Sequence, residues 1–308
     1  MATTATTVVA TTTTSTIPPL ALPTVVLRVG VRTYDWFDWS RPTPANGNYR
    51  ARNRRELVTT IWYPAQGAPS TYVHRGARAD RAHGPYPIVL FAHGHGGEPA
   101  AYTALVSNWV SRGYVVVAPA FPLSRARAPG GPTYNDLPSQ PGDLTYVLSR
   151  ALGENRDPRS WMYNLLDARR IAAAGHSMGA WTVLALVGNQ CCHDQRVTAA
   201  IVLAGEMAPA FTKPFFKAPV PPILFVHARD DDVVPYAAGA RAYAAARAPK
   251  YFLTVSGAHI QPYWGPKTPV GATVLQVTND FLDRYVRDIA TVKLASPDRR
   301  YGTLQSKL

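Results

Sequence analysis

The stretch RIAAAGHSMGAWTVLALVGN, residues 170–189, predicts the fold more directly than any other part of the chain. It begins as a short apolar strand, passes through Gly175, Ser177 and Gly179, and continues with the apolar spacing of a helix. In a strand–turn–helix of the pattern G-x-S-x-G, the turn is so tight that side chains two positions either side of the serine would collide, and glycine removes the clash. The bare pattern also occurs by chance, so the prediction that Ser177 is a nucleophile rests on its place between a strand and a helix. There the serine lies beside a helix N-terminus, which favours developing negative charge.

Short apolar runs and helical segments alternate around this stretch. Two early strands, within 24–40 and 56–64, are joined by a polar loop rich in turn residues. Further strands are expected at 87–93, 114–120, 170–175, 197–205, 222–228 and 251–257, and helices at 99–113, 142–153, 177–189, 236–248 and 274–290. Such alternation predicts one α/β domain with a mainly parallel sheet and helices on both faces. We expect this domain at 23–290, after a flexible Thr-rich tail at 1–22 and before a C-terminal extension at 291–308.

A serine hydroxyl is a weak nucleophile, so it needs a base, and the base needs an orienting acid. Three aspartates, Asp230, Asp231 and Asp232, follow the predicted strand at 222–228, and His259 follows the next one. In an open parallel sheet the carboxyl ends of the strands are where ligands bind. The order serine, aspartate, histidine along the chain therefore predicts a triad of Ser177, one of the three aspartates, and His259.

Five segments in the same order resemble a known group of enzymes. They are RELVTTIWYPA, PYPIVLFAHGHGG, DARRIAAAGHSMGA, DDDVVP and SGAHI. The chain is similar over about residues 25–289 to α/β-hydrolases of the serine-esterase type, in the branch of the platelet-activating-factor acetylhydrolases, dienelactone hydrolases and bacterial polyester hydrolases. The resemblance implies that the acid is Asp231, four residues before Pro235, although the register remains open by one residue. Ala180 stands where this branch usually has a further glycine, and serine replaces the cysteine nucleophile of the dienelactone hydrolases.

The stretch FAHGHGGEPA, residues 91–100, allows two interpretations. The spacing of His93 and His95 fits a pair of metal ligands, whereas the glycines fit a loop whose backbone approaches a substrate. The resemblance implies the second, with an oxyanion hole formed by the backbone N–H groups of His95 and Met178. A fuller metal motif would need Asp and His at positions 97 and 98, where the chain has Gly97 and Glu98. We therefore expect no metal and no cofactor.

The formal net charge is +13 at pH 7, and most of it comes from arginine. Apart from RARNRR at residues 50–55, the arginines are scattered, which is more typical of a solvated surface than of a nucleic-acid interface. The adjacent Cys191 and Cys192 are expected to be unbonded thiols, because neighbouring cysteines do not easily bridge; a soft-metal site with His193 is the alternative.

The sequence contains no apolar run long enough for a transmembrane helix. The Thr-rich start lacks the features of a signal peptide, and it favours a secreted or surface protein whose signal has been removed, with a cytoplasmic location as the alternative. The protein is expected to act as a monomer.

The loops around the predicted site suggest open access. Residues 206–221, rich in Pro and Phe, are too few for a helical cap, and the loop after residue 120 lacks helical periodicity. Phe215, Phe216 and Tyr263 are candidates for the rim of a shallow cleft, with ordinary packing under loops as an equal alternative. We therefore expect a carboxylic ester hydrolase that acts on short-chain, lipid or polyester-type esters. Alternatives are a thioesterase, amidase or peptidase with the same site, or a non-catalytic binding protein of the same fold.

Overall fold

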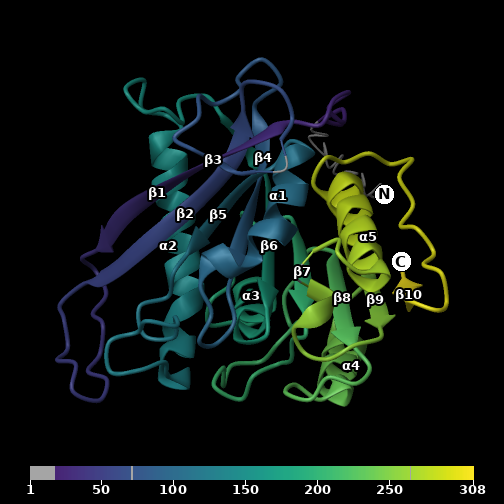
Figure 1. The fold of residues 1–308 in the computed structure, drawn as a ribbon. Coiled ribbons are helices and arrows are strands. Elements are labelled where there is room, and N and C mark those ends of the chain that lie inside the picture. Colours follow the sequence, from purple (N-terminus) through teal and green to yellow (C-terminus); the bar gives the residue numbers. More distant parts are fainter. Residues whose placement is uncertain (1–17, 71, 264) are drawn as a thin grey trace, which may run out of the picture.

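The chain forms one mixed sheet with helices on both faces, as the computed structural model shows for residues 18–70, 72–263 and 265–308 (Figure 1). The strands are β1 (Arg28–Asp38), β2 (Arg55–Ala65), β3 (His74–Arg75), β4 (Tyr86–Ala92), β5 (Val115–Pro119), β6 (Leu166–His176), β7 (Ala199–Leu203), β8 (Ile223–Ala228), β9 (Lys250–Val255) and β10 (Gly302–Lys307). The α-helices are α1 (Thr103–Ser111), α2 (Gln140–Glu154), α3 (Met178–Gly188), α4 (Tyr236–Ala245) and α5 (Pro269–Tyr285), and the short 3₁₀ helices are η1 (Pro99–Tyr102), η2 (Tyr134–Ser139) and η3 (Gln261–Tyr263).

The strands lie in the order β10-β9-β8-β7-β6-β4-β5-β2-β1-β3. Neighbouring strands from β5 to β9 are parallel, while β1, β2 and β10 add antiparallel pairs at the two sides. The parallel strands β4, β5, β7, β8 and β9 are buried along their whole length, as expected of strands covered on both faces. The predicted α/β fold with a mainly parallel sheet is confirmed.

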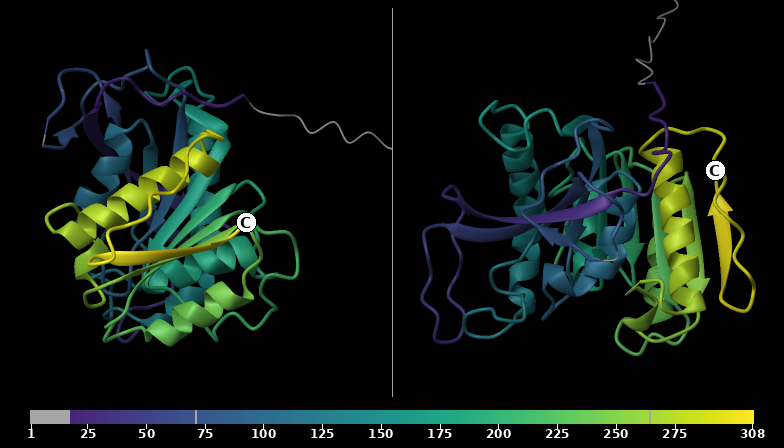
Figure 2. Two further views of the ribbon diagram at one scale, coloured as in Figure 1. Left: turned by 90° about the vertical axis from the view of Figure 1, so that its right-hand side faces the viewer. Right: turned by 45° about the horizontal axis from the view of Figure 1, so that its top comes forward.

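Two apolar layers fill the space between the sheet and its helices. On one face, α1 and α5 contribute Trp109 and Phe281 to a buried cluster. On the other face, α2, α3 and α4 contribute Val147, Val183 and Ala242 to a second cluster. Figure 2 shows the helices on either side of the twisted sheet. No helix in the described segments is long and apolar enough to cross a membrane.

The strand order reverses at β4, which places the site. The chain goes from β4 to β5 on one side of it and then crosses to β6 on the other side. At their carboxyl ends, Ala92 of β4 lies opposite Gly175 of β6. Ligands of open α/β sheets bind outside the strands at such a switch point. The loop that contains His93 and His95 therefore meets the turn that contains Ser177.

The two ends of the domain extend further than the sequence indicates. Strand β10 lies in the segment expected to be a C-terminal extension, and it pairs with β9 from Gly302 opposite Val255 onward. Its sequence, GTLQSK, lacks the apolar alternation that would have predicted a strand. At the other end, Leu20 donates its N–H to the Arg287 carbonyl. Residues 18–22 of the expected tail thus contact the domain, and residues 1–17 lie outside the described residues.

Cys191 and Cys192 form a disulfide with each other, so the expectation of two unbonded thiols is wrong. Their Cα atoms are only 3.7 Å apart, closer than in most disulfides. The two cysteines are consecutive and lie in the turn after α3, where Asn189 accepts the N–H of Cys191 with its side chain and the N–H of Cys192 with its carbonyl. Since both sulfurs are used, the alternative of a soft-metal site with His193 has no thiolate available.

Candidate active site

Ser177 stands at the turn between β6 and α3 with φ 56° and ψ −126°, a conformation that residues with a side chain rarely adopt. The flanking glycines are required by close contacts. A β-carbon at Gly175 would collide with the carbonyl of Gly179, and one at Gly179 would collide with the carbonyl of Ala92. The N–H of Ser177 donates to the Leu203 carbonyl at 2.9 Å, which ties the turn to β7. Strained turns of this kind persist only where the surroundings hold them, and they cluster at functional sites.

The ring of His259 lies against the carboxylate of Asp231. Its Nδ1 is 2.9 Å from both carboxylate oxygens, and His259 is buried. Burial by itself would raise the pKa of Asp231, but hydrogen bonds from His227, His259 and the N–H groups of Val233 and Val234 lower that pKa well below its usual range. The ionised carboxylate holds the proton of His259 on Nδ1, which leaves Nε2 as the basic nitrogen.

The three consecutive aspartates have different surroundings. Asp231 contacts the imidazole of His259, whereas the one hydrogen bond of Asp232 within the described residues is from the backbone N–H of His259, at 3.3 Å. Asp230 lines a small cavity near β10, together with Arg300. Asp231 is therefore the aspartate whose position suits an orienting acid.

His176, the residue before Ser177, connects three parts of the site. Its Nε2 lies 2.9 Å from the carbonyl of His259 and its Nδ1 lies 2.8 Å from the hydroxyl of Tyr102. Because a carbonyl only accepts, Nε2 carries the proton and Tyr102 donates to Nδ1. The Tyr102 oxygen also accepts the N–H of Gly94 at 3.2 Å. Burial lowers the pKa of His176 to about 4, so the ring is neutral at pH 7 and joins the loop after β4, the turn at Ser177 and the loop of His259.

No hydrogen bond joins the Ser177 hydroxyl to His259 within the described part of the chain. Catalytic hydrogen bonds are often long or poorly aligned before substrate is bound, so this geometry does not disqualify His259 as the base. The loop of His259 is instead tied to the turn of Ser177 by His176, the residue before the serine, which donates to the His259 carbonyl.

The loop after β4 offers a backbone donor beside the serine. The N–H of Gly96 donates to the Ser124 carbonyl and that of Gly97 to the Gly94 carbonyl. Among the residues that the structure describes, no acceptor occupies the N–H of His95 or the N–H of Met178. Met178 begins α3, where backbone N–H groups have no partner within the helix. These two N–H groups are thus left without an acceptor, as the expected oxyanion hole requires.

His93 holds this loop in place. Its Nε2 accepts the N–H of Phe121 at 3.0 Å, and its Nδ1 therefore donates to the Gly94 carbonyl at 2.8 Å. Burial lowers the pKa of His93 to about 4. Both ring nitrogens are bonded to backbone, so neither is free to bind a metal ion. In the described segments, no three His, Cys, Asp or Glu side chains gather as metal ligands.

An aromatic wall, formed by His95, Tyr134 and Trp181, is the feature that sequence reasoning missed. The rings of His95 and Tyr134 stack with centroids 4.0 Å apart and an angle of 9°. Tyr134 in turn lies 6.0 Å from Trp181, which is in the first turn of α3. The His95 Nδ1 and the Trp181 Nε1 are buried without a hydrogen-bond partner in the described chain. Three separate segments build this wall, so no sequence pattern connects its members.

Two of the three aromatic residues expected at the rim of a cleft are buried instead. Phe216 packs in the core beneath Gly188 of α3. Tyr263 is fully buried beneath the site, where its ring lies 5.0 Å from His176 and its hydroxyl accepts the N–H of Ala228. The rim assignment is therefore wrong for both, because each fills space between the sheet and a loop. Phe215 is half-buried and packs in a small cluster with Met178 and Phe211.

The segments around Ser177 include no helical cap. Residues 206–221 contain no helix, as expected from their length. The loop after β5 differs from the expectation, because η2 forms at Tyr134–Ser139 where the sequence lacks helical periodicity. A 3₁₀ helix this short needs no such periodicity, and here it presents Tyr134 to the aromatic wall.

Comparisons with known proteins bear on this site. A family model described as chlorophyllase matches residues 77–205, which include the loop after β4 and Ser177 but not Asp231 or His259. The structure is similar to that of a ferulic acid esterase from Streptomyces cinnamoneus, with a TM-score of 0.68, 24% sequence identity, and coverage of 93% of this chain and 99% of that chain. No curated protein matches the sequence. The structural similarity shows that the chain has the α/β-hydrolase fold, and the family model covers less than half of the chain.

Proposed function

We propose that the protein is a serine carboxylic ester hydrolase in which Ser177, His259 and Asp231 act as a catalytic triad. The observation that carries this proposal is the strained turn at Ser177 on the same edge of the sheet as the bonded pair His259 and Asp231. A strained serine, a buried histidine and an ionised carboxylate suit the roles of nucleophile, base and orienting acid.

In this mechanism the Ser177 hydroxyl attacks the ester carbonyl and transfers its proton to Nε2 of His259. The Asp231 carboxylate stabilises the resulting imidazolium. The N–H groups of His95 and Met178 bind the oxyanion of the tetrahedral intermediate, and removal of one such donor typically costs about 3 kcal/mol. His259 then protonates the leaving alcohol, and water releases the acyl group from Ser177 by the same steps.

The substrates are short-chain, lipid or polyester-type esters that reach Ser177 from an open surface. The absence of a helix in residues 206–221 supports open access, and the aromatic wall supports binding of a planar or apolar group beside the oxyanion donors. No cofactor and no nucleic acid takes part, and the protein acts as a monomer. The disulfide between Cys191 and Cys192 supports a secreted or surface location, since disulfides persist mainly in oxidising compartments.

A fluorophosphonate probe on the full chain tests the class of the protein. It should label the wild type at one residue, Ser177, and fail to label Ser177→Ala. A set of p-nitrophenyl esters of rising chain length, with a phospholipid and a polyester film, then ranks the substrates. Labelling at another residue would contradict the assignment of Ser177, and no labelling with no hydrolysis would favour a binding protein of this fold. Turnover of thioesters or amides above that of esters would favour the alternative enzyme classes.

A further inference from the structure

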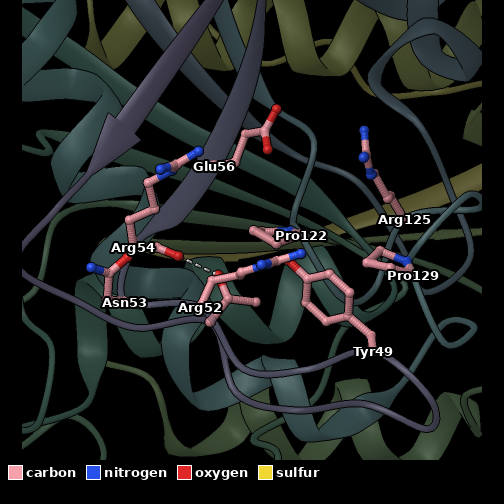
Figure 3. A pocket seen from close by; sticks show the side chains of 9 residues that line it. Tyr49, Arg52, Asn53, Arg54, Glu56, Pro122, Arg125 and Pro129 are labelled. Carbon is pink, nitrogen blue, oxygen red and sulfur yellow. Dashed lines mark hydrogen bonds between the residues drawn. The ribbon is translucent and has the colours of Figure 1, made fainter.

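A polar cavity of about 510 Å³ lies between two loops outside the triad (Figure 3). One loop joins β1 to β2, and the other follows β5. The lining residues are Thr43, Tyr49, Arg52, Asn53, Arg54, Glu56, Pro122, Arg125 and Pro129. No residue of the proposed triad or of the aromatic wall is among them, so the cavity is a separate feature of the molecule.

The walls of this cavity are held by hydrogen bonds within and between the two loops. Thr43 and Arg52 exchange backbone hydrogen bonds of 2.8 and 3.0 Å, and the Thr43 hydroxyl donates to the Arg54 carbonyl at 2.8 Å. The Asn46 side chain donates to the carbonyls of Pro129 and Gly131 in the second loop. The cavity is thus built before any ligand arrives.

Three arginines and one carboxylate, Glu56, line the cavity, so its charge is positive. Within the described residues, no carboxylate lies within salt-bridge distance of Arg52, Arg54 or Arg125. The neighbouring Arg55 differs, because it is buried and pairs with Asp136 and Asp143. The run of arginines at residues 50–55 therefore divides into one internal ion pair and a set of unpaired cations at a cavity.

Two of the three arginines stand over aromatic rings. The Arg54 guanidinium lies 4.9 and 4.7 Å from the ring centres of Phe37 and Trp39, and that of Arg52 lies 5.5 Å from the ring centre of Tyr49. Arg54 thus contacts two rings, whereas the one ring beside Arg52, that of Tyr49, also belongs to the cavity wall. Figure 3 shows the Arg52 side chain beside the Tyr49 ring, and the Arg125 side chain on the second loop extending away from both.

Arg125 lines the cavity from the second loop, and its side chain is only partly buried. Its Nε is buried, yet it has no hydrogen-bond partner in the described chain. Its terminal nitrogens also have no hydrogen-bond partner in the described chain and, unlike Nε, are not enclosed, so they are available to a ligand. A planar guanidinium matches the two oxygens of a carboxylate or phosphate.

We propose that this cavity is a binding site for an oxyanion, a carboxylate or a phosphate, held by the unpaired arginines that line it, Arg52 and Arg125 among them. The site adjoins the proposed oxyanion loop, because Gly97 and Arg125 form a β-bridge and the N–H of Ala126 donates to the Gly97 carbonyl at 3.0 Å. The anion is therefore either an acidic group carried by an ester substrate or a free anion bound beside the active site.

Calorimetric titration of the full chain with inorganic phosphate, at constant ionic strength, tests the site. The comparison uses Arg125→Gln, Arg52→Gln and the control Arg127→Gln, which removes the same charge from an exposed residue of the same loop outside the cavity. Each cavity variant should bind phosphate roughly tenfold or more weakly than the control, since each loses a charge-assisted hydrogen bond. Equal binding by Arg125→Gln and Arg127→Gln, or no phosphate binding by the wild type, would overturn the proposal.

A second measurement distinguishes the source of the anion. It compares an acidic ester, p-nitrophenyl hemisuccinate, with the neutral ester p-nitrophenyl butyrate. If the anion belongs to the substrate, Arg125→Gln should raise KM for the acidic ester at least about tenfold more than KM for the neutral one. An equal change for both esters, with phosphate binding lost, would assign the site to a free anion. Phosphate binding does not depend on the proposed function, because Ser177→Ala should bind phosphate as the wild type does, whether or not the wild type hydrolyses esters.

Discussion

His176 and His259 lie side by side beneath the same edge of the sheet, with ring centroids 4.8 Å apart, and both are buried. Their partners differ. His259 has the carboxylate of Asp231 at Nδ1, whereas His176 has a tyrosine hydroxyl and a backbone carbonyl. Burial among neutral groups lowers the pKa of His176 to about 4, whereas the carboxylate beside His259 fixes the orientation and tautomer of its ring. The partner of a histidine, and not its place next to the serine in sequence, therefore decides which ring suits proton transfer.

The largest expected difference in activity is between variants of these two histidines. We expect His259→Ala to lower kcat by about 10⁴-fold or more, as removal of a triad base does elsewhere. His176→Phe should cost only about 10- to 100-fold, because it removes positioning hydrogen bonds rather than the base. Steady-state rates with p-nitrophenyl acetate check both values. A greater loss in the His176 variant would show that His259 is not the base.

The next effect tests the partner of His259. Asp231→Asn should lower kcat by about 10⁴-fold, because an amide cannot stabilise the imidazolium and favours the wrong tautomer. Asp232→Asn should cost far less, since the one hydrogen bond of Asp232 within the described residues is from the backbone N–H of His259. Parallel kinetics of the two variants measure the difference. If Asp232→Asn is the more damaging change, the register of the acid is wrong by one residue.

A third histidine extends the comparison, because the partner of His95 is an aromatic ring. Removal of the stacking ring in Tyr134→Ala should raise KM for p-nitrophenyl benzoate by roughly 2- to 10-fold, the range expected for one aromatic contact. The change in KM for p-nitrophenyl acetate should be smaller. Tyr163→Ala, at another exposed tyrosine that lies outside the aromatic wall, serves as the control. Equal effects of Tyr134→Ala on both esters would exclude the wall as a binding surface.

The smallest effect concerns stability and pH. The pKa of Asp231 is lower in the folded protein than the usual value of about 4, so the unfolded chain binds a proton more readily at acidic pH. The stabilisation from this carboxylate is therefore present above about pH 4 and is lost as the pH falls through the lower folded pKa. Urea unfolding of the wild type and Asp231→Asn should show a stability difference at pH 7 that narrows below pH 4. If the difference in unfolding free energy between the two proteins does not change with pH, folding does not lower the pKa of Asp231.

Sequence reasoning predicts the features that depend on local patterns. The apolar runs predict the parallel strands, and the G-x-S-x-G turn between a strand and a helix predicts the conformation that Ser177 adopts. The sequence also predicts the order of Asp231 and His259 after successive strands. These features can be predicted because the residue pattern of a strand and the steric need for glycine in a tight turn each involve only a few neighbouring residues.

Features built from distant segments could not be predicted in this way. Tyr134 joins the aromatic wall from a loop whose sequence has no regular period. For Phe216 and Tyr263 the sequence left a place at the rim and packing under loops equally open, and the structure buries both. The cavity arginines look like a solvated charged run in sequence, and only the packing of two loops gives them a common cavity.

Rapid-quench mass spectrometry of the wild type with p-nitrophenyl acetate is the most direct test of Ser177 as the nucleophile. We expect an acetylated intermediate during turnover, with the acetyl group on the peptide that contains Ser177. Ser177→Ala should form no such adduct and should lose hydrolysis, while circular dichroism shows the same fold. Acetylation at another residue, or wild-type hydrolysis by Ser177→Ala, would contradict the assignment.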